Sequence, residues 1–334
     1  MNPDDAAKRQ APAARYGFYD RLKAEFPSQI LVDAAEVCNL ACTHCPHPEF
    51  KKSEHYGGRY VDPELNAKMV DEVRRHGQGC TQYIRYASNG EPLTHPDIYD
   101  MIDYAAKQSG VLVTLTTNGT FMTEKRSGCL LASGVDVVDV SIDAHTPETY
   151  ARVRVNGDLA VTRANTLKLI ELARQSSAGT KVVVSYVEMP LNAHETRDFE
   201  SFWKDHGADY VVVRRLHSCS GAKISLAEVR RRENAEVARR PCLYPWERIV
   251  LNARGDLSFC PSDWVHGSYI ADYRSVTIYD TWHGEFYRRL REAHLSNDFS
   301  GHAFCGQCPD WRSTRWPDEG RSYANMMEEF MAEE

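Results

Sequence analysis

The chain has 334 residues, which at about 150 residues per domain allows one large domain with a smaller companion or two domains of moderate size. Hydrophobic residues make up 42% and charged residues 26%, so the composition argues against wholesale disorder and low-complexity architectures. The net charge of -7 gives no electrostatic footprint for nucleic acid or an anionic membrane, and it favours a small-molecule or peptide partner.

The sequence also argues against membrane insertion and export. No uncharged apolar run approaches the roughly 18 residues that a membrane helix needs. The opening segment carries Asp4 and Asp5 where a secretory signal has an apolar core, so we expect a cytoplasmic protein. In that reducing compartment the ten cysteines are not expected to form disulfides, and clustered cysteines indicate metal or redox chemistry.

Short β-rich runs alternate with helical patterns in the first two thirds of the chain. The predicted strands cover residues 29–34, 82–86, 112–117, 135–142, 181–187 and 210–216. Helical spacing of apolar residues marks the segments 63–75, 96–108 and 159–174 between them. This alternation is typical of an α/β protein with a parallel sheet. Six units fall short of the eight in a closed TIM barrel, so we predict a partial (β/α)6 TIM barrel, with an open doubly wound sheet as the alternative.

The pattern changes after residue 216. A charged stretch at 227–240 reads as a linker or a solvated helix, and residues 242–311 combine short β-like runs with an amphipathic helix near 281–293. The tail carries Met326, Met327, Phe330 and Met331, which is typical of a terminal helix packing its apolar face. We predict an N-terminal extension (1–28), the barrel (29–218), a linker (219–240), a small C-terminal domain (241–312) and a tail helix (313–334).

The first cysteine set is Cys38, Cys42 and Cys45, spaced C-x3-C-x2-C immediately after the first predicted strand. Three thiolates on one short loop can hold three irons of a 4Fe-4S cluster and leave the fourth iron open. An open coordination position is where a substrate or cosubstrate binds. The alternatives are a zinc site completed by His44 or His47, or three unmetallated cysteines. The place at the carboxyl end of a strand favours a catalytic cluster.

With this motif the chain resembles the radical SAM superfamily, and the resemblance extends over the whole predicted barrel. It implies an enzyme whose open iron binds the amino and carboxylate groups of S-adenosylmethionine (SAM). An electron from a donor such as flavodoxin or ferredoxin then leads to cleavage of SAM into methionine and a 5'-deoxyadenosyl radical.

The resemblance also assigns contacts to SAM, in the same order along the chain as in the family. His44 takes the position of an adenine contact, and the segment after the second strand matches the family's GGEP motif, which binds the methionine amino group, with Asn89 in place of the first glycine. The implied contacts are His44, Gly90, Glu91, Pro92, Thr117, Asn118, Ser141, Asp143 and Arg154. Taken singly, these residues are explained as helix caps, turns or surface charges, but their order on successive strand ends supports the family.

The second cysteine set is Cys242, Cys260, Cys305 and Cys308, spaced C-x17-C-x44-C-x2-C. Four thiolates saturate a metal centre, and the spacing fits zinc as well as a 4Fe-4S cluster. The region resembles the C-terminal SPASM and twitch modules of radical SAM enzymes. Because no cysteine follows Cys308, the twitch form with one auxiliary 4Fe-4S cluster is the closer match.

Three further residues are candidates for the reaction itself: Glu188, Cys219 and Arg214. The Glu188 carboxylate would deprotonate the hydroxyl of a carbinol radical, and the Cys219 thiol would donate a hydrogen atom to a substrate radical. Arg214 would bind an anionic or polyol substrate, although Arg214 and Arg215 point to opposite faces of an alternating strand. The alternatives are an exposed charge at Glu188 and a loop cysteine with no catalytic part at Cys219.

The resemblance to twitch enzymes that oxidise aminocyclitol alcohols implies the reaction. We expect hydrogen abstraction from a carbinol C–H of a sugar-like natural-product intermediate (aminocyclitol, amino sugar or nucleoside sugar), followed by oxidation. A small substrate is favoured because no leader-peptide-binding domain is recognisable before the barrel. The alternatives are decarboxylation of a nucleoside uronic acid, epimerisation through Cys219, peptide modification, or a noncatalytic iron-sulfur or zinc protein.

Overall fold

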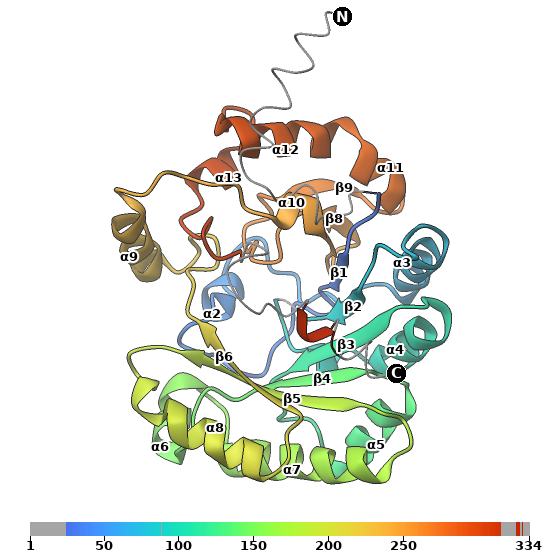
Figure 1. Cartoon of the computed structure of the whole chain (residues 1–334), viewed down its shortest axis with the longest axis vertical. Helices are drawn as coiled ribbons and strands as arrows, with labels where there is room; N and C mark the ends of the chain where they lie inside the picture. The colour runs from blue at the N-terminus through green and yellow to red at the C-terminus, as the bar shows by residue number, and fades with distance from the viewer. Residues whose placement is uncertain (1–24, 88, 315–324, 328, 330–334) are drawn as a thin grey trace, which may run out of the picture.

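The computed structural model describes residues 25–87, 89–314, 325–327 and 329. Its strands join in one sheet with the order β6-β5-β4-β3-β2-β1-β7-β8-β9 (Figure 1). The first six are β1 (Gln29–Val32), β2 (Tyr83–Tyr86), β3 (Leu112–Thr117), β4 (Val137–Ser141), β5 (Lys181–Glu188) and β6 (Tyr210–Arg215). They pair in parallel and in chain order. A doubly wound sheet reverses its order at a switch point, so the predicted partial (β/α)6 TIM barrel is confirmed.

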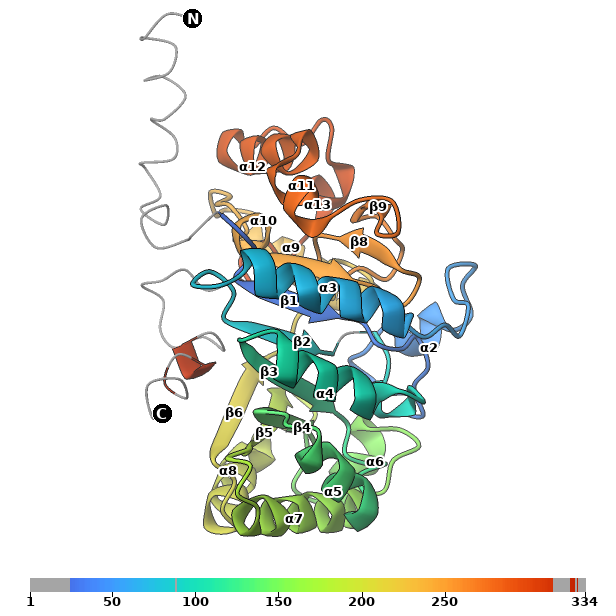
Figure 2. The ribbon, with the colours of Figure 1, turned by 90° about the vertical axis from the view of Figure 1, so that its right-hand side faces the viewer.

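Helices connect the parallel strands and cover the outer face of the sheet, where Figure 2 shows α3 and α4 side by side. The helices are α2 (His47–Phe50), α3 (Pro63–His76), α4 (Ile98–Gln108), α5 (Glu124–Ala132), α6 (Pro147–Val153), α7 (Leu159–Gln175) and α8 (Thr196–Asp205), with short 3-10 turns η1 (Pro92–Thr94) and η2 (Ala193–Glu195). Asp62 and Asp158 cap α3 and α7, because their side chains accept backbone N–H groups of the first turn. These caps define where the two helices begin.

Side chains alternate between the two faces of the sheet, and the outer face is apolar. Val184 and Tyr186 of β5 are fully buried in one apolar cluster with Phe199 and Trp203 of α8. The ring centroids of Tyr186 and Phe199 are 4.5 Å apart. Because successive side chains of a strand point to opposite faces, Ser185 faces the interior of the barrel.

The amino-terminal end of the barrel interior is apolar, and two methionines near the end of the chain cover it. Met326 and Met327 are 3% and 0% exposed, and they pack in one cluster with Tyr83, Val137 and Val183. The predicted tail helix was expected to pack its apolar face against the rest of the protein, and these two methionines are buried in this way. Phe330 and Met331 of that helix lie outside the described residues.

The cysteine-rich C-terminal segment extends the sheet of the barrel. Strand β7 (Arg248–Leu251) pairs in parallel with β1, and β8 (Asp256–Ser258) and β9 (Tyr269–Asp272) continue in antiparallel pairing. The helices here are α9 (Ile224–Asn234), α10 (Tyr244–Glu247), α11 (Ile278–His283), α12 (Glu285–Ser296) and α13 (Ala303–Gln307). The amphipathic helix expected near 281–293 is two helices, because Gly284 adopts an extended backbone (ψ 173°) that ends α11 and caps α12. None of the described helices has the length and apolar character of a membrane span.

Candidate active site

The first cysteine set lies on the loop between β1 and α2, at the carboxyl edge of the parallel strands. Two backbone hydrogen bonds, from Ala41 N to Val155 O and from Thr43 N to Val153 O, attach this loop to the end of α6. Burial raises the pKa of Cys38 to about 11 and that of Cys45 to about 12. The free thiols therefore hold their protons at neutral pH, and binding of iron has to release them.

A buried ion pair lies beside this loop. Arg154 contacts Asp143 (Nη2 to Oδ2, 2.6 Å) and donates to the sulfur of Cys42 (Nη1 to Sγ, 3.6 Å). His44 Nε2 lies 3.6 Å from the same Asp143 oxygen, and burial lowers the pKa of His44 to about 4. The structure thus brings together three of the predicted SAM contacts and one predicted iron ligand, with a permanent cation next to the thiol.

Glu91 joins the loop after β2 to the end of β3. Its carboxylate accepts hydrogen bonds from Thr117 Oγ1 (2.7 Å), Asn118 N (2.7 Å) and Leu93 N (3.0 Å). The Asn118 side chain donates in turn to Oδ1 of Asn39, which lies between Cys38 and Cys42 on the cysteine loop (2.9 Å). Residues from three loops are therefore held together by direct hydrogen bonds.

Gly90 lies against the backbone of the cysteine loop. A Cβ atom at this position would be 2.1 Å from the carbonyl oxygen of Ala35 and 2.5 Å from that of Val37. The preceding Asn89 fills the place of a motif glycine and donates from Nδ2 to the carbonyl oxygen of Asp263 (3.1 Å). Gly90 is required because the backbone of the cysteine loop approaches it closely. Asn89 connects the loop after β2 to the cysteine-rich C-terminal segment by a hydrogen bond.

The carboxyl end of the barrel interior is polar. Asp139 of β4 is fully buried, and its carboxylate accepts from Ser185 Oγ (2.6 Å), Arg85 Nη2 (3.2 Å) and Arg214 Nη2 (2.5 Å). The Arg85 guanidinium also donates to Thr116 Oγ1 (2.8 Å). We call Arg85, Thr116, Asp139, Ser185 and Arg214 the polar wall.

The polar wall continues to the predicted SAM contacts through Ser141, whose Oγ lies 3.2 Å from Ser185 Oγ. The composition of the strands carried a signal for this wall that our sequence analysis missed. Charged residues interrupt two apolar strands, as Arg85 in YIRY and Asp139 in VVDVS. A buried charge requires a partner, so the two residues were candidates for a pair.

Glu188 does not reach this site. It is exposed, follows the outward-facing Tyr186 by two positions, and accepts a hydrogen bond from Thr196 Oγ1 at the start of α8 (2.7 Å). The expectation that Glu188 points to the active-site face is wrong, because the alternation of β5 turns it to the outside of the barrel. Arg215 is likewise exposed on the outer side, whereas Arg214 faces inward.

Cys219 lies on a strained loop after β6. Cys219, Ser220 and Gly221 have φ angles of 54°, 56° and 101°, in the left-handed region that non-glycine residues rarely adopt. Asp310 holds the loop by accepting from Ser220 N (2.8 Å) and from Ser218 Oγ (2.7 Å). Burial raises the pKa of Cys219 well above its usual range, and the nearby Cys45 and Cys260 raise it further. Cys219 is thus within electrostatic range of both cysteine sets.

The second cysteine set lines a partly open cavity. All four cysteines line it, together with the aromatic rings of Tyr244, Phe259, Phe304 and Trp311. Burial raises the pKa of Cys242 to about 12. In the described part of the chain, no group of three or more His, Cys, Asp or Glu side chains is arranged to hold a single metal ion. Four thiols around one cavity are a ligand set that could hold a metal cluster.

The first set also fits its predicted cofactors. His44 Nδ1 and Arg154 Nε are buried without a hydrogen-bond partner, and both belong to the predicted SAM contacts. Unpaired buried polar atoms are costly, so they indicate a group that completes the site. Cys38, Cys42 and Cys45 would hold the cluster, and contacts of His44, Glu91 and Arg154 with SAM stay a prediction.

Comparison with known proteins identifies the class. The family model of the radical SAM superfamily matches residues 34–202, and that of the SPASM iron-sulfur cluster-binding domain matches residues 242–309. The chain belongs to the radical SAM superfamily. Its cofactors are a SAM-binding 4Fe-4S cluster, an auxiliary cluster and SAM, in agreement with the two cysteine sets.

Curated relatives match part of the chain. A probable GTP 3',8-cyclase of Methanococcus maripaludis is 28% identical over 176 residues, which cover 53% of this chain and 55% of the relative. The mycofactocin maturase MftC of Mycobacterium ulcerans is 28% identical over 212 residues, covering 63% and 52% respectively. The chain thus spans about half the length of these relatives.

Solved structures share the fold over a larger part of the chain. BtrN in complex with AdoMet and 2-DOIA has a TM-score of 0.58 at 17% identity, covering 85% of this chain and 93% of BtrN. SuiB of Streptococcus suis bound to the precursor peptide SuiA has a TM-score of 0.63 at 14% identity, covering 98% and 79% respectively.

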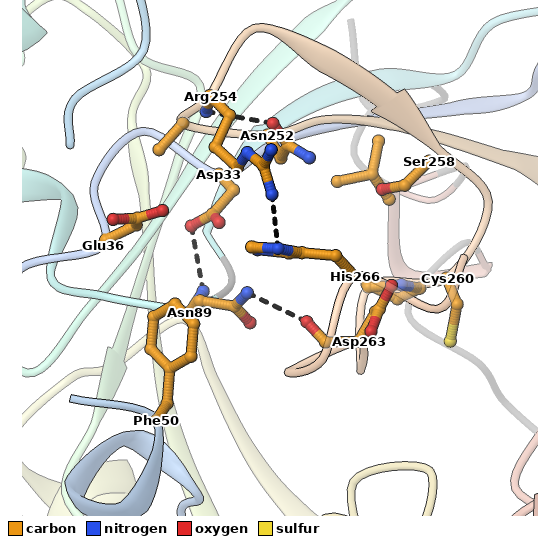
Figure 3. A pocket seen from close by; sticks show the side chains of 13 residues that line it. Asp33, Glu36, Phe50, Asn89, Asn252, Arg254, Ser258, Cys260, Asp263 and His266 are labelled. Atoms are coloured by element: carbon orange, nitrogen blue, oxygen red, sulfur yellow. Dashed lines mark hydrogen bonds between the residues drawn. The ribbon is translucent and has the colours of Figure 1, made fainter. Parts of the chain in front are cut away.

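A polar pocket lies between the loops at the carboxyl ends of β1 and β2 and the cysteine-rich C-terminal segment (Figure 3). Asp33 at the end of β1 accepts from Asn89 N (3.0 Å), and Arg254 and His266 close the other side through a side-chain contact of 2.5 Å. Burial, with a smaller contribution from the nearby Glu36, raises the pKa of Asp33 to about 8. Asp33 is therefore mostly a neutral carboxylic acid at pH 7.

Substitution of Gly90 by alanine is expected to weaken SAM binding. The added Cβ has to displace two carbonyl oxygens of the cysteine loop, and overpacking of about 1–3 kcal/mol corresponds to roughly tenfold or more in affinity. SAM binding by the iron-loaded protein measures the effect. Gly128→Ala on α5 is the control, because nothing lies within 4 Å of its added Cβ. Equal SAM affinity in the two variants would contradict the close approach.

Substitution of Asp33 by asparagine is expected to remove a pH-dependent loss of stability. Since the folded pKa is raised, folding favours the protonated acid, and stability falls as pH rises from about 4 to about 8. The melting temperature of Asp33→Asn minus that of the unsubstituted protein should therefore increase between about pH 6 and pH 8. Asp205→Asn, at an exposed position, is the control. A constant difference across this range would show that Asp33 is ionised.

Proposed function

We propose that this radical SAM enzyme abstracts a hydrogen atom from a carbinol C–H of a small, sugar-like substrate and oxidises the alcohol to a carbonyl. The observation that carries the proposal is the polar wall on the inner face of the barrel, next to the predicted SAM contacts. Arginine, threonine and serine side chains on one surface offer hydrogen bonds to several hydroxyl groups or to an anionic substituent. An apolar substrate would remove water from these polar groups without forming hydrogen bonds to them.

The reaction balances with the cofactors of the family. When bound, the first cluster supplies a 5'-deoxyadenosyl radical from SAM, at the cost of one electron from a donor of the flavodoxin or ferredoxin class. The substrate carbon gives up its hydrogen atom and 5'-deoxyadenosine forms. The hydroxyl group would then release its proton to water as the C=O bond forms. An auxiliary cluster held by Cys242, Cys260, Cys305 and Cys308 would be the acceptor of the remaining electron. Glu188 takes no part, since it lies on the outer face.

Epimerisation is a second candidate, and the placement of Cys219 favours it. The Cys219 loop adopts strained backbone angles between the two cysteine sets, and the raised pKa keeps hydrogen on the sulfur. A protonated thiol can donate a hydrogen atom to the substrate radical, leaving a thiyl radical that requires an electron and a proton to reset. The auxiliary cluster is a source for that electron. This route yields a product of unchanged mass, whereas oxidation yields one that lacks two hydrogens.

Label transfer tests the proposed hydrogen abstraction. The reconstituted enzyme is incubated with SAM, a reductant and a panel of aminocyclitols, amino sugars and nucleoside sugars deuterated at carbinol carbons. Deuterium is expected in 5'-deoxyadenosine, with a carbonyl product of matching amount. The triple variant Cys38→Ala, Cys42→Ala, Cys45→Ala should form neither. A product with the substrate's formula, in which a solvent hydrogen has replaced the carbinol deuterium, would replace oxidation by epimerisation, and transfer from none of the panel would contradict the sugar-like substrate.

Adjacent arginines give a matched test of the polar wall. Arg214→Gln removes a guanidinium from the inner face, and loss of a charge-assisted hydrogen bond of about 1.5–3 kcal/mol is expected to raise KM for the substrate by roughly tenfold or more. Arg215→Gln removes the same group from the exposed outer side and should leave KM unchanged. Steady-state kinetics with the substrate found by label transfer measure both. An equal effect of the two substitutions would argue against substrate binding at the wall.

A further inference from the structure

The cavity of the second cysteine set contains a buried imidazole that no cysteine motif predicts. His294 on α12 is 4% exposed and lines the cavity together with the four cysteines. The rings of Trp246 and Phe299 flank it edge-on, with centroids at 6.1 Å and 4.9 Å from the imidazole. These aromatic contacts limit rotation of the imidazole plane.

Hydrogen bonding assigns the tautomer of this ring. The backbone N–H of Cys242 donates to Nδ1 of His294 at 3.3 Å, so Nδ1 is the acceptor and the hydrogen of the neutral ring is on Nε2. Nε2 is buried and has no hydrogen-bond partner in the structure. Leaving a buried N–H unpaired costs about 1–3 kcal/mol. The cavity should therefore hold an acceptor for this N–H, and the sulfur atoms of a cluster are acceptors.

Two other side chains surround the cavity with positive charge and donors. Arg239 lines it and donates to the carbonyl oxygens of Cys305 (2.5 Å) and Gly306 (2.9 Å), while its Nε is buried without a partner. Ser220 Oγ lies 3.5 Å from Cys260 Sγ. Donors and cations next to a cluster stabilise its more negative, reduced state and so raise its reduction potential.

We propose that His294 donates a hydrogen bond from Nε2 to a sulfur of the auxiliary cluster and thereby raises the potential at which that cluster accepts an electron. His294 is a positioning and tuning residue, because it acts through the cluster. The role rests on the proposed oxidation: the electron left on the substrate after hydrogen abstraction passes to the cluster, and the substrate proton leaves as the carbonyl forms.

Two substitutions separate the functions of the two ring nitrogens. His294→Asn retains an oxygen that can accept the Cys242 N–H, but its side chain is too short to donate a hydrogen bond from the position of Nε2. His294→Gln places an N–H near the position of Nε2, but it removes the acceptor that Nδ1 offers to the Cys242 N–H. His206→Asn is the control, since His206 is exposed at the end of α8 and its ring nitrogen contacts Phe202 O.

The measurement is a redox titration of the full-length, iron-loaded protein, followed by electron paramagnetic resonance without substrate. The triple Cys38, Cys42, Cys45 to alanine background isolates the signal of the auxiliary cluster. We expect a more negative potential in His294→Asn, and a potential close to that of the parent in His294→Gln and His206→Asn. An unchanged potential in His294→Asn, or an equal drop in His294→Gln, would overturn the inference. Because substrate is absent, failure of the oxidation assay remains a separate result that concerns the proposed reaction.

Discussion

The negative charge of buried thiolates is the constraint on which this structure depends. Burial raises the pKa of cysteines in both sets, so a positive charge beside each set lowers the free-energy cost of releasing their protons to iron. Arg154 provides it at the first set, held in place by Asp143, and Arg239 provides it at the second. Hydrogen bonds hold both guanidinium groups in place, so each positive charge lies next to its cysteine set.

The sheet determines how the two cysteine sets are related. Because β7 pairs with β1, the C-terminal cysteines are attached to the strand that precedes Cys38, Cys42 and Cys45. Asn89 strengthens this connection by bonding the loop after β2 to Asp263, and the Cys219 loop meets both sets from the end of β6. The two cysteine sets are thus connected through one sheet and through direct hydrogen bonds.

Strand alternation separates residues that look equivalent in the sequence. Glu188 and Arg214 both lie at carboxyl ends of neighbouring strands, yet the first contacts α8 outside the barrel and the second contacts Asp139 inside it. The polar wall results from the same rule, since Asp139, Ser185 and Arg214 occupy inward positions of three adjacent strands. The apolar residues nearer the amino ends of these strands are covered by Met326 and Met327.

The sequence by itself determined the strand and helix order, the partial barrel, the cysteine sets and the family, because hydrophobic periodicity and short-range ligand spacing are local properties of the chain. The family resemblance also assigned Glu91, Asp143 and Arg154 as SAM contacts, which stays a prediction. Only the tertiary structure decided that β7 joins β1, that Glu188 faces outward, and that His294 completes the cavity of Cys242. Those results depend on strand register and on contacts between residues far apart in the chain, which no local pattern encodes.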